Sequence, residues 1–365
     1  MTTTEVSDTT VELTPISLAP LTGPRPLVSV LMANYNYVSY VATAIESVIG
    51  QSYSNWELIV CDDGSSDASV DVVERYVRME SRVRLIVKRN GGHASALNAA
   101  YAICGGEIIC LLDSDDVYAR TKIESVVNCC LEFPDRGLIA HRVIRVNQRR
   151  TKEGVWPLLN ALPEGWLGVR LLGEGGILPF LPPSSGLSLR RGLSDRLFPM
   201  PTVRPLGACP DQIIVRLAPL ITSIGSVDKA LAEYRLHAAN SYGASRVTVP
   251  FLDRETEFGK ALWNHQHTFL SQISPSLAAK LKPVTETEYF SFIEYLRAKL
   301  GRERSAKVLH QRYMTTLKQV RRNSWSTSFW RWSFYLPAPV FDFTINLFLG
   351  QNILKRAIAR LKGFA

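Results

Sequence analysis

The sequence EIICLLDSDD, residues 107–116, runs from an apolar segment directly into three aspartates, Asp113, Asp115 and Asp116. The apolar part predicts a buried strand, and carboxylates crowded at its end repel one another unless a cation lies among them. Such clusters hold Mg²⁺ or Mn²⁺ beside a substrate diphosphate. A solvated turn that caps a helix beginning near Arg120 is the alternative interpretation.

Outward from this stretch, apolar runs alternate with segments of helical periodicity. Strands are expected at residues 27–32, 56–61, 83–87, 107–112 and 137–146, and helices at 40–49, 70–77, 94–103 and 121–131. This alternation predicts a parallel sheet covered on both faces, with a ligand site beyond the carboxyl ends of its strands. Three of those ends carry polar loops, at residues 34–36, 62–67 and 113–116. One shared site explains three such loops better than three independent turns do.

The composition limits the class of protein. Of 365 residues, 46% are hydrophobic and 21% are charged, as in a folded globular chain. Residues 301–365 hold 12 Lys and Arg against two acids, whereas residues 1–300 are close to neutral. The 6 cysteines lack CxxC spacing, which indicates a reducing, cytoplasmic compartment. Residues 1–24 lack the pattern of a secretory signal and predict a flexible leader.

Neither GxGxxG nor GxxxxGK[ST] occurs, so a glycine-rich loop is not expected to hold the phosphates. Residues 28–147 instead resemble the nucleotide-sugar domain of the family 2 glycosyltransferases. The matching motifs are VSV at 28–30 with NYN at 34–36, DDGSSD at 62–67, NGG at 90–92 with Ala96 and Asn98, and LLDSDD at 111–116. The resemblance implies the GT-A fold, a Rossmann-like α/β fold with a mostly parallel sheet. It also implies a nucleotide-sugar half at 25–147 and an acceptor half at 148–248.

The resemblance assigns roles to particular side chains. The nucleotide sugar would be bound by Ala33, Asn34, Asn36, Asp62, Asn98, Asp113 and Ser114. Asp62 would accept a hydrogen bond from the nucleobase, which suits the imide N–H of uracil or thymine. Asp113 and Asp115 match the two acids of the DxD motif of the family, with Asp115 on the metal and Asp113 on ribose or metal. For Asn34 and Asn36 the alternative is turn stabilisation, and for Asp63 and Asp67 an Asx-turn and a helix N-cap are the preferred interpretation.

The acceptor half contributes two candidates. Displacement at an anomeric carbon needs a carboxylate that takes the proton of the acceptor hydroxyl. Asp211 stands where the family keeps this base, although many members have Glu-Asp where this chain has Pro210 and Asp211; an N-cap is the alternative. His237 matches the Tyr-Arg-x-His element of the family and would complete the metal shell or contact the diphosphate. An imidazole ligand favours Mn²⁺ over Mg²⁺.

The C-terminal region, residues 249–365, is predicted to be helical, with helices at 251–270, 286–300 and 305–320. From residue 321 onward, aromatic and basic residues are interleaved. The longest uncharged run there has 12 residues, too few to span a bilayer. Two interpretations stay open for residues 321–365: a segment lying on an anionic membrane, or a helical lid packed on the catalytic domain or a second subunit. Nucleic-acid binding is not expected.

Together these patterns predict a metal-dependent, inverting glycosyltransferase of polysaccharide or glycoconjugate biosynthesis. It would move one sugar from a UDP- or dTDP-sugar to a hydroxyl of a carbohydrate or lipid-linked glycan, at the inner face of the cell membrane if the tail binds there. The Gln-x-x-Arg-Trp motif of processive members is absent, which favours single transfer. A sugar-phosphate nucleotidyltransferase and a non-catalytic scaffold are the rival hypotheses. The first would need a glycine-rich basic loop after the first strand, which the sequence lacks.

Overall fold

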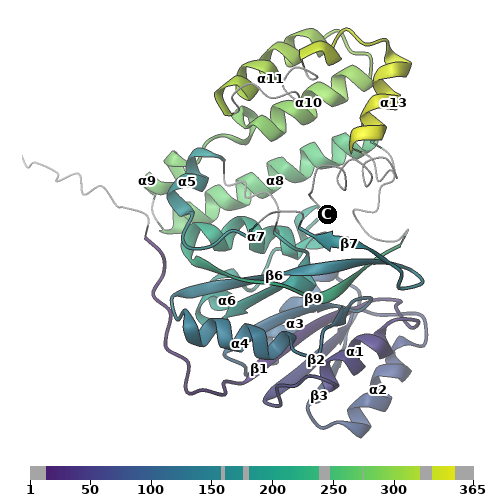
Figure 1. Cartoon of the computed structure of the whole chain (residues 1–365), viewed down its shortest axis with the longest axis vertical. Helices are drawn as coiled ribbons and strands as arrows, with labels where there is room; N and C mark the ends of the chain where they lie inside the picture. The colour runs from purple at the N-terminus through teal and green to yellow at the C-terminus, as the bar shows by residue number, and fades with distance from the viewer. Residues whose placement is uncertain are drawn as a thin grey trace, which may run out of the picture.

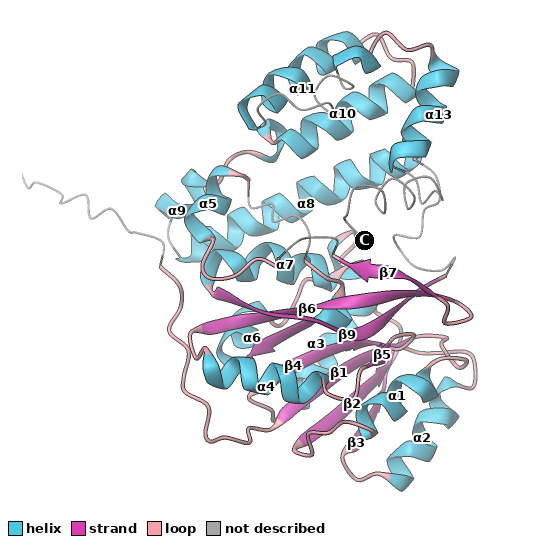
Figure 2. Ribbon diagram, in the orientation of Figure 1, coloured by secondary structure: helices cyan, strands magenta, loops and turns pink. Residues whose placement is uncertain are grey.

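The computed structural model describes residues 14–157, 161–175, 181–237, 247–273, 275–320 and 331–349. Figure 1 shows a domain of sheet and helices next to a lobe of helices formed by the C-terminal part of the chain. The strands of the described residues form one sheet of nine, in the order β3-β2-β1-β4-β8-β6-β9-β5, with β7 paired to β6. Helices cover both faces of this sheet (Figure 2). The predicted GT-A type of α/β architecture is confirmed.

The N-terminal half positions the polar loops. It contains β1 (Val28–Asn34), α1 (Val41–Ile49), β2 (Trp56–Asp62), α2 (Ser69–Met79), β3 (Val83–Val87), α3 (His93–Ile103) and β4 (Ile108–Asp113). Its four strands are parallel, and the register places Asn34 beside Asp62 and Ala33 beside Asp113. Each of these elements lies within two residues of its predicted bounds. The three polar loops therefore meet at one edge of the sheet, as the alternating pattern predicts.

The second half completes the same sheet. It contains β5 (Val117–Tyr118), α4 (Lys122–Glu132), β6 (Arg136–Asn147), β7 (Lys152–Trp156), α5 (Gly168–Gly173), β8 (Leu187–Arg190), α6 (Arg191–Leu197), α7 (Pro210–Ile221) and β9 (Ser223–Leu236). Strand β8 lies antiparallel between β4 and β6, and β9 runs parallel to β6. The sheet is thus parallel around β1 and mixed beyond β4. The division of the chain at residues 147 and 148 stays a prediction, because both halves share one sheet.

Alternate side chains of the central strands build two apolar layers. Leu31 and Leu111 face the layer that includes α3, α6 and α7. Val30 and Leu112 face the opposite layer, which includes α1, α2 and α4. Strands that are buried on both faces read as continuous apolar runs, which is why residues 107–112 could be recognised as a strand. Burial on both faces also fixes where each strand ends, and so where its polar loop begins.

The predicted leader is described from residue 14, and this part is bound to the domain. The Ile16 N–H donates to the carbonyl of Ile221 (2.7 Å), and the Thr22 N–H donates to Glu107 (2.7 Å). Arg190, which is buried, donates to the carbonyl of Ala19 (2.6 Å). The described part of the predicted leader, residues 14–24, is therefore hydrogen-bonded to the domain through Ile16, Ala19 and Thr22. The rest of the predicted leader lies outside the described residues.

The C-terminal lobe is helical, as its periodicity predicts. Its helices are α8 (Val249–Ile273), α9 (Pro275–Lys280), α10 (Glu288–Leu300), α11 (Ala306–Val320) and α13 (Ala338–Leu349). Tyr295, Tyr313 and Phe341 are buried in a core that belongs to this lobe. Gln266 on α8 donates to the carbonyl of Arg216 on α7 (3.0 Å), which ties the lobe to the sheet domain. Every helix within the described ranges is too short or too polar to cross a bilayer.

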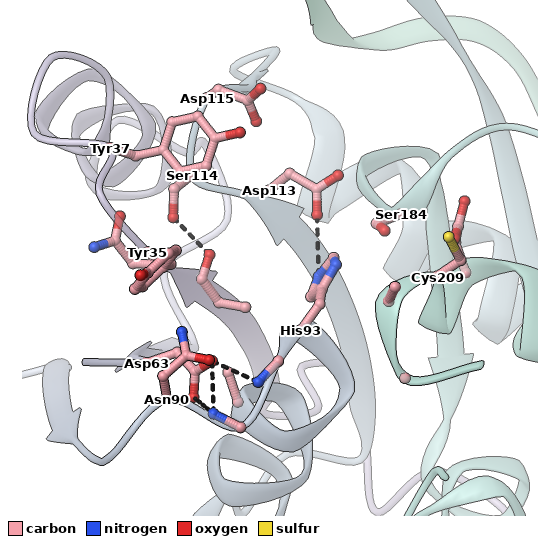
Figure 3. A pocket seen from close by; sticks show the side chains of 18 of the residues that line it. Tyr35, Tyr37, Asp63, Asn90, His93, Asp113, Ser114, Asp115, Ser184 and Cys209 are labelled. Atoms are coloured by element: carbon pink, nitrogen blue, oxygen red, sulfur yellow. Dashed lines mark hydrogen bonds and ion pairs between the residues drawn. The ribbon is translucent and has the colours of Figure 1, made fainter. Parts of the chain in front are cut away.

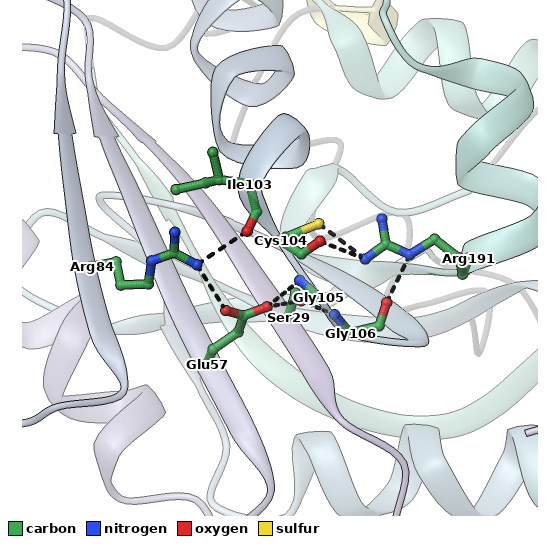
Figure 4. Close-up of polar contacts among 8 residues, drawn as sticks. All are labelled: Ser29, Glu57, Arg84, Ile103, Cys104, Gly105, Gly106 and Arg191. Atoms are coloured by element: carbon green, nitrogen blue, oxygen red, sulfur yellow. Dashed lines mark hydrogen bonds and ion pairs between the residues drawn. The ribbon is translucent and has the colours of Figure 1, made fainter. Parts of the chain in front are cut away.

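A polar network joins the amino ends of the strands, at the edge of the sheet remote from the polar loops (Figure 4). Glu57 accepts from the hydroxyl of Ser29 (2.6 Å) and from the N–H of Gly105 (2.6 Å). The Gly106 N–H donates to the Ser29 hydroxyl (2.8 Å). Arg84 adds a bond to the carbonyl of Ile103 (3.0 Å). The network holds the turn between α3 and β4 tightly against β1.

We expect Gly106→Ala to destabilise the fold more than Gly105→Ala. A Cβ at position 106 would lie 2.5 Å from both the backbone N and the hydroxyl of Ser29, whereas at position 105 its nearest neighbour is 3.6 Å away. Overpacking of this kind costs about 1–3 kcal/mol of unfolding free energy. Urea denaturation of the two variants measures the difference. Equal midpoints at equal m-values would contradict the tight contact at Gly106.

Candidate active site

A pocket of about 890 Å³ opens at the carboxyl ends of β1 and β4. Seven of the ten predicted site residues line it: Ala33, Asn34, Asn36, Asp113, Ser114, Asp115 and Asp211. Figure 3 shows Asp113 and Asp115 on one side of this pocket and Cys209, which precedes Asp211 by two residues, on the other. The pocket therefore brings together residues from both predicted halves of the chain. Asp62, Asn98 and His237 are not among its lining residues.

The turn after β1 uses the two asparagines differently. Asn34 is buried, and its amide N–H donates to Asp62 (2.7 Å), while its Oδ1 is a buried acceptor without a partner in the described part of the chain. Asn36 has a φ of 57°, a left-handed conformation that asparagine tolerates. Its Oδ1 accepts from the Ser66 N–H (2.8 Å). Asn36 thus stabilises the turn, whereas Asn34 leaves an acceptor at the pocket wall.

The predicted role of Asp62 is not supported by its position. Asp62 is fully buried, and its carboxylate accepts from the N–H of Ser65 (2.8 Å), the hydroxyl of Ser65 (2.7 Å) and the amide of Asn34. It is the last residue of β2, so its side chain points into the fold and that of Asp63 points the other way. The carboxylate of this pair that lines the pocket is that of Asp63.

Asp63 was expected to stabilise an Asx-turn, but it bridges two loops instead. It accepts from the ammonium of Lys88 (2.6 Å) and from the N–H groups of Gly91 (3.0 Å) and Gly92 (2.7 Å). These bonds hold the 90–92 turn, where Gly92 has a φ of 90°, beside the pocket. Asp67 is not the N-cap residue of α2, which is Ala68. Its carboxylate accepts from the Ser69 N–H (2.9 Å) within its own turn and from the Val38 N–H (3.0 Å) in the loop after β1.

Asn98 was predicted to bind the nucleotide sugar, and it too lies outside the lining of the pocket. It donates to the carbonyl of Met200 and accepts from the N–H of Met200, both at 2.8 Å. Its amide is thereby fully engaged with the backbone of the 198–209 segment. This segment leads to Asp211 and contributes Arg204 to the pocket. Asn98 therefore anchors the segment to α3 and does not face the ligand space.

The acids of the cluster differ in whether they line the pocket. Asp113 and Asp115 line the pocket, whereas Asp116 is buried and accepts from the hydroxyl of Ser185 (2.6 Å) and the N–H of Arg235 (2.8 Å). The Ser114 hydroxyl donates to the carbonyl of Ala33 (2.7 Å), which fastens the cluster to β1. Two of the three acids are thus presented to the pocket, and the third joins the cluster to β8 and β9.

Negative charge accumulates at Asp113. Burial, followed by the charges of Asp115 and Asp211, raises the pKa of Asp113 well above its ordinary value. The nearest imidazole is that of His93, whose Nε2 lies 3.6 Å from Oδ1 of Asp113. Burial lowers the pKa of His93 to about 4, so this imidazole is neutral at physiological pH. The site therefore favours a cation beside Asp113.

His237 contacts the cluster from behind and does not line the pocket. Its Nε2 lies 2.6 Å from Oδ2 of Asp115, and its ring stacks on Tyr40 with centroids 5.8 Å apart. Tyr37, which lines the pocket, meets the same ring edge-on at 5.7 Å. His237 therefore orients the Asp115 carboxylate. In the described parts of the chain, no three His, Cys, Asp or Glu side chains converge as a ready-made metal site.

The carboxylates of two aspartates in the pocket nevertheless suit a hard divalent cation. Mg²⁺ and Mn²⁺ are commonly bound by one or two carboxylates together with substrate phosphates and water. Asp113 and Asp115 supply the carboxylates, and the excess of negative charge at Asp113 supplies the electrostatic reason. The residues present fit such a cation if the bound substrate completes its ligands. His237 could reach it only if its contact with Asp115 opened.

Asp211 faces the acidic cluster from the other side of the pocket. It lies in the first turn of α7, where Cys209 is the N-cap residue and makes no side-chain capping bond. The N-cap alternative for Asp211 is therefore not supported. Burial raises the pKa of Asp211 above its ordinary value. A partly buried carboxylate of raised pKa that lines a pocket has the properties of a general base.

Sequence reasoning missed several side chains of the pocket, among them Tyr37, Asp63, His93 and Arg204. The strict alternation of side chains at the end of β2 is a signal that could have exchanged Asp62 for Asp63. His93 directly follows the NGG motif and begins α3. Arg204 lies in an irregular segment without periodicity. It is the one Lys or Arg among the described residues that line the pocket.

Comparisons with known proteins agree with this geometry. Residues 29–183 match the family "Glycosyl transferase family 2". An uncharacterized glycosyltransferase of Nostoc sp. is 29% identical over 238 residues, which cover 65% of this chain and 73% of that protein. The UDP-Glc:alpha-D-GlcNAc-diphosphoundecaprenol beta-1,3-glucosyltransferase WfgD of Escherichia coli is 38% identical over 107 residues, which cover 29% of this chain. The chain spans only 42% of WfgD.

The fold has a counterpart among solved structures. The crystal structure of residues 1–349 of TarS from S. aureus superposes with a TM-score of 0.51 at 16% identity, covering 81% of this chain and 93% of that one. At this identity the likeness concerns the fold alone. Together with the family match over the strands that carry the acidic cluster, it agrees with the GT-A architecture. Residues 29–183 form a glycosyl transferase family 2 domain, and the chain belongs to the glycosyltransferases.

Proposed function

We propose that this glycosyltransferase transfers one sugar, with inversion, from a UDP- or dTDP-sugar to a hydroxyl of a carbohydrate or lipid-linked glycan, in polysaccharide or glycoconjugate biosynthesis. One observation carries the proposal: Asp113 and Asp115 at the end of β4 and Asp211 at the start of α7 line one pocket. Acids on two walls suit a reaction in which a diphosphate leaves on one side and a hydroxyl attacks from the other. The similarity to WfgD, a glucosyltransferase named for a diphosphoundecaprenol-linked acceptor, supports a lipid-linked acceptor.

The nucleobase would lie at the end of the pocket formed by Asn34 and Asp63. Three donors, the ammonium of Lys88 and the N–H groups of Gly91 and Gly92, already bond to the Asp63 carboxylate, with the Gly91 N–H shared between its two oxygens. Since a carboxylate offers about four acceptor sites, Asp63 would accept the imide N–H of uracil or thymine at the remaining one, in place of Asp62. The unpartnered Oδ1 of Asn34 could accept a second N–H or O–H from the nucleoside. A buried orphan acceptor is costly until such a donor arrives.

The diphosphate would lie beside the acidic cluster. Asp113 and Asp115 would hold Mn²⁺ or Mg²⁺, with His237 fixing the rotamer of Asp115 from behind. When bound, the metal would supply electrostatic stabilisation of the leaving diphosphate. The guanidinium of Arg204 would add positive charge from the opposite rim. Asp211 would take the proton of the acceptor hydroxyl as this oxygen attacks the anomeric carbon.

Release of nucleoside diphosphate from a panel of UDP-, dTDP- and GDP-sugars, with Mn²⁺, Mg²⁺ or chelator, tests the function. We expect metal-dependent release from a UDP- or dTDP-sugar that accelerates when a glycan acceptor is added. Release of pyrophosphate from a sugar phosphate and a nucleoside triphosphate would instead identify a nucleotidyltransferase. Binding of donors without turnover on any acceptor would identify a scaffold.

We expect Asp63→Asn to weaken UDP binding about tenfold, because a charge-assisted bond to the base would become a neutral one. Asp67→Asn is the matched control, since Asp67 lies in the same loop and bonds only to N–H groups outside the pocket. Isothermal titration with UDP measures both. Thermal unfolding verifies that each variant is folded. Equal affinities for the two variants would contradict the assignment of Asp63 to the base.

A further inference from the structure

The helical lobe exposes large apolar side chains along one short stretch. Trp332 is 65% exposed, Tyr335 is 72%, Val340 is 46% and Phe343 is 69%. These four residues, which we call the aromatic edge, lie within 12 positions of one another. Single exposed apolar residues are ordinary on protein surfaces, but a cluster of them marks a site of interaction. Figure 1 shows α13, which carries two of them, at the margin of the lobe.

The exposure of the aromatic edge does not arise from a lack of packing. On α13, Phe341 and Ile345 are buried in the lobe core, four residues apart on one face. Val340 and Phe343 lie three residues apart on another face and point outward. The helix is therefore apolar on two sides and only one of them is used by the fold. The inner face of α13 packs into the core of the helical lobe, and the outer face is available.

Ser333, which lies between Trp332 and Tyr335 in the sequence, anchors this segment so that both rings point outward. Ser333 is fully buried, and its hydroxyl lies 2.9 Å from the hydroxyl of Tyr295 in the lobe core. The rings of Trp332 and Tyr335 contact each other with centroids 5.8 Å apart. They form one wall of a groove of about 420 Å³, with Gln311 and Met314 of α11 on the other. The aromatic rings are thus displayed on a fixed backbone.

Among the described residues, basic side chains are exposed beside the aromatic edge and elsewhere on the lobe. In sequence, residues 301–365, part of which lies outside the described ranges, contain 12 Lys and Arg but only Glu303 and Asp342 as acids. Of these acids, Glu303 forms an ion pair with Arg297, and Asp342 accepts from the amide of Asn346. Arg331 lies next to Trp332 and lines the same groove, and Arg302, Arg304 and Lys307 are exposed on the lobe. A partner surface that complements the aromatic edge would therefore be negatively charged and able to accept apolar side chains.

We propose that the aromatic edge docks the lobe onto an anionic phospholipid bilayer. Trp and Tyr side chains are preferred at the level of the headgroups, where ring and polar tip each find a suitable environment. Lys and Arg near the surface attract anionic lipids within a Debye length. The lobe lies on the bilayer and does not cross it, in keeping with its short or polar described helices. Surface binding would concentrate the enzyme where lipid-linked acceptors lie.

Cosedimentation of the full chain with phospholipid vesicles tests the proposal. Vesicles of phosphatidylcholine alone are compared with vesicles containing about 30% phosphatidylglycerol, each at low and high salt. We expect binding to the anionic vesicles that weakens with salt. The double variant Trp332→Ser with Tyr335→Ser, and the variant Phe343→Ser, should each bind about five- to tenfold more weakly. Val169→Ser on α5 is the control, because Val169 is 65% exposed outside the aromatic edge.

The outcomes separate the possible occupants of this surface. Binding of the wild type to anionic vesicles, reduced in the aromatic variants but not in Val169→Ser, supports the proposal. Absence of vesicle binding overturns it, as does equal binding by all variants. A dimer in light scattering that the aromatic variants dissociate would show that a second copy covers the edge, and would also overturn it. Binding of UDP, measured in parallel, reports on the pocket independently of the lobe.

Discussion

Replacing Asp211 with Asn is expected to lower kcat by about 10³-fold while leaving the affinity for the donor nearly unchanged. A general base contributes roughly 10²- to 10⁴-fold to rate, and Asp211 lies on the wall of the pocket opposite Asp113 and Asp115. The asparagine keeps the size of the side chain and cannot take the proton. Steady-state kinetics with a competent acceptor, together with titration of UDP, separates the two effects.

The pH dependence gives a second readout for Asp211. Burial disfavours the ionised form and raises the pKa of this carboxyl above its ordinary value. Because the base must be ionised, activity should fall with decreasing pH, and should begin to fall at a higher pH than for an ordinary aspartate. The residual activity of Asp211→Asn should lose the part of this limb that Asp211 contributes and keep the part that arises from Asp113, whose pKa is also raised. A variant with wild-type kcat, or with an unchanged acid limb, would show that the base is elsewhere.

The sequence predicted where the polar loops lie better than where their side chains point. Parallel strands with apolar residues on both faces are readable, and their ends fix the loops at 34–36, 62–67 and 113–116. Side chains alternate between the two faces of the sheet along β2, so only one of Asp62 and Asp63 can point toward the pocket. A family motif does not specify which of the two does. In the structure both carboxylates are buried, and of the two only Asp63 lines the pocket.

Other parts of the site depend on contacts between distant segments. Asn98 bonds to Met200, 102 positions away, and nothing in the local sequence signals this pairing. Strand β7 escaped prediction because its side chains are mostly exposed at the edge of the sheet and show no apolar alternation. The two residues of β5 are too few to give a pattern. Tertiary context decides such elements more than propensity does.

Replacing Asp115 with Ala is expected to abolish detectable transfer, with a loss of at least about 10³-fold in kcat/KM. It should also remove any enhancement of UDP affinity by Mn²⁺. In this variant Asp113 alone would face the diphosphate, and the partner of His237 would be lost. Titration of UDP with and without Mn²⁺ measures the coupling without requiring turnover. Uridine, which lacks phosphates, should bind the wild type and the variant equally.

The neighbouring acid provides the control that makes this result specific to the pocket. Asp116 is the same residue type one position away, but it does not line the pocket, is buried and is bonded to Ser185 and Arg235. We expect Asp116→Asn to lower the unfolding midpoint and to retain the coupling between Mn²⁺ and UDP. His237→Gln should weaken the coupling only in part, because it loosens Asp115 without removing it. If Asp115→Ala kept the full effect of Mn²⁺, the metal would not be held by this carboxylate, and the charge excess at Asp113 would need another partner.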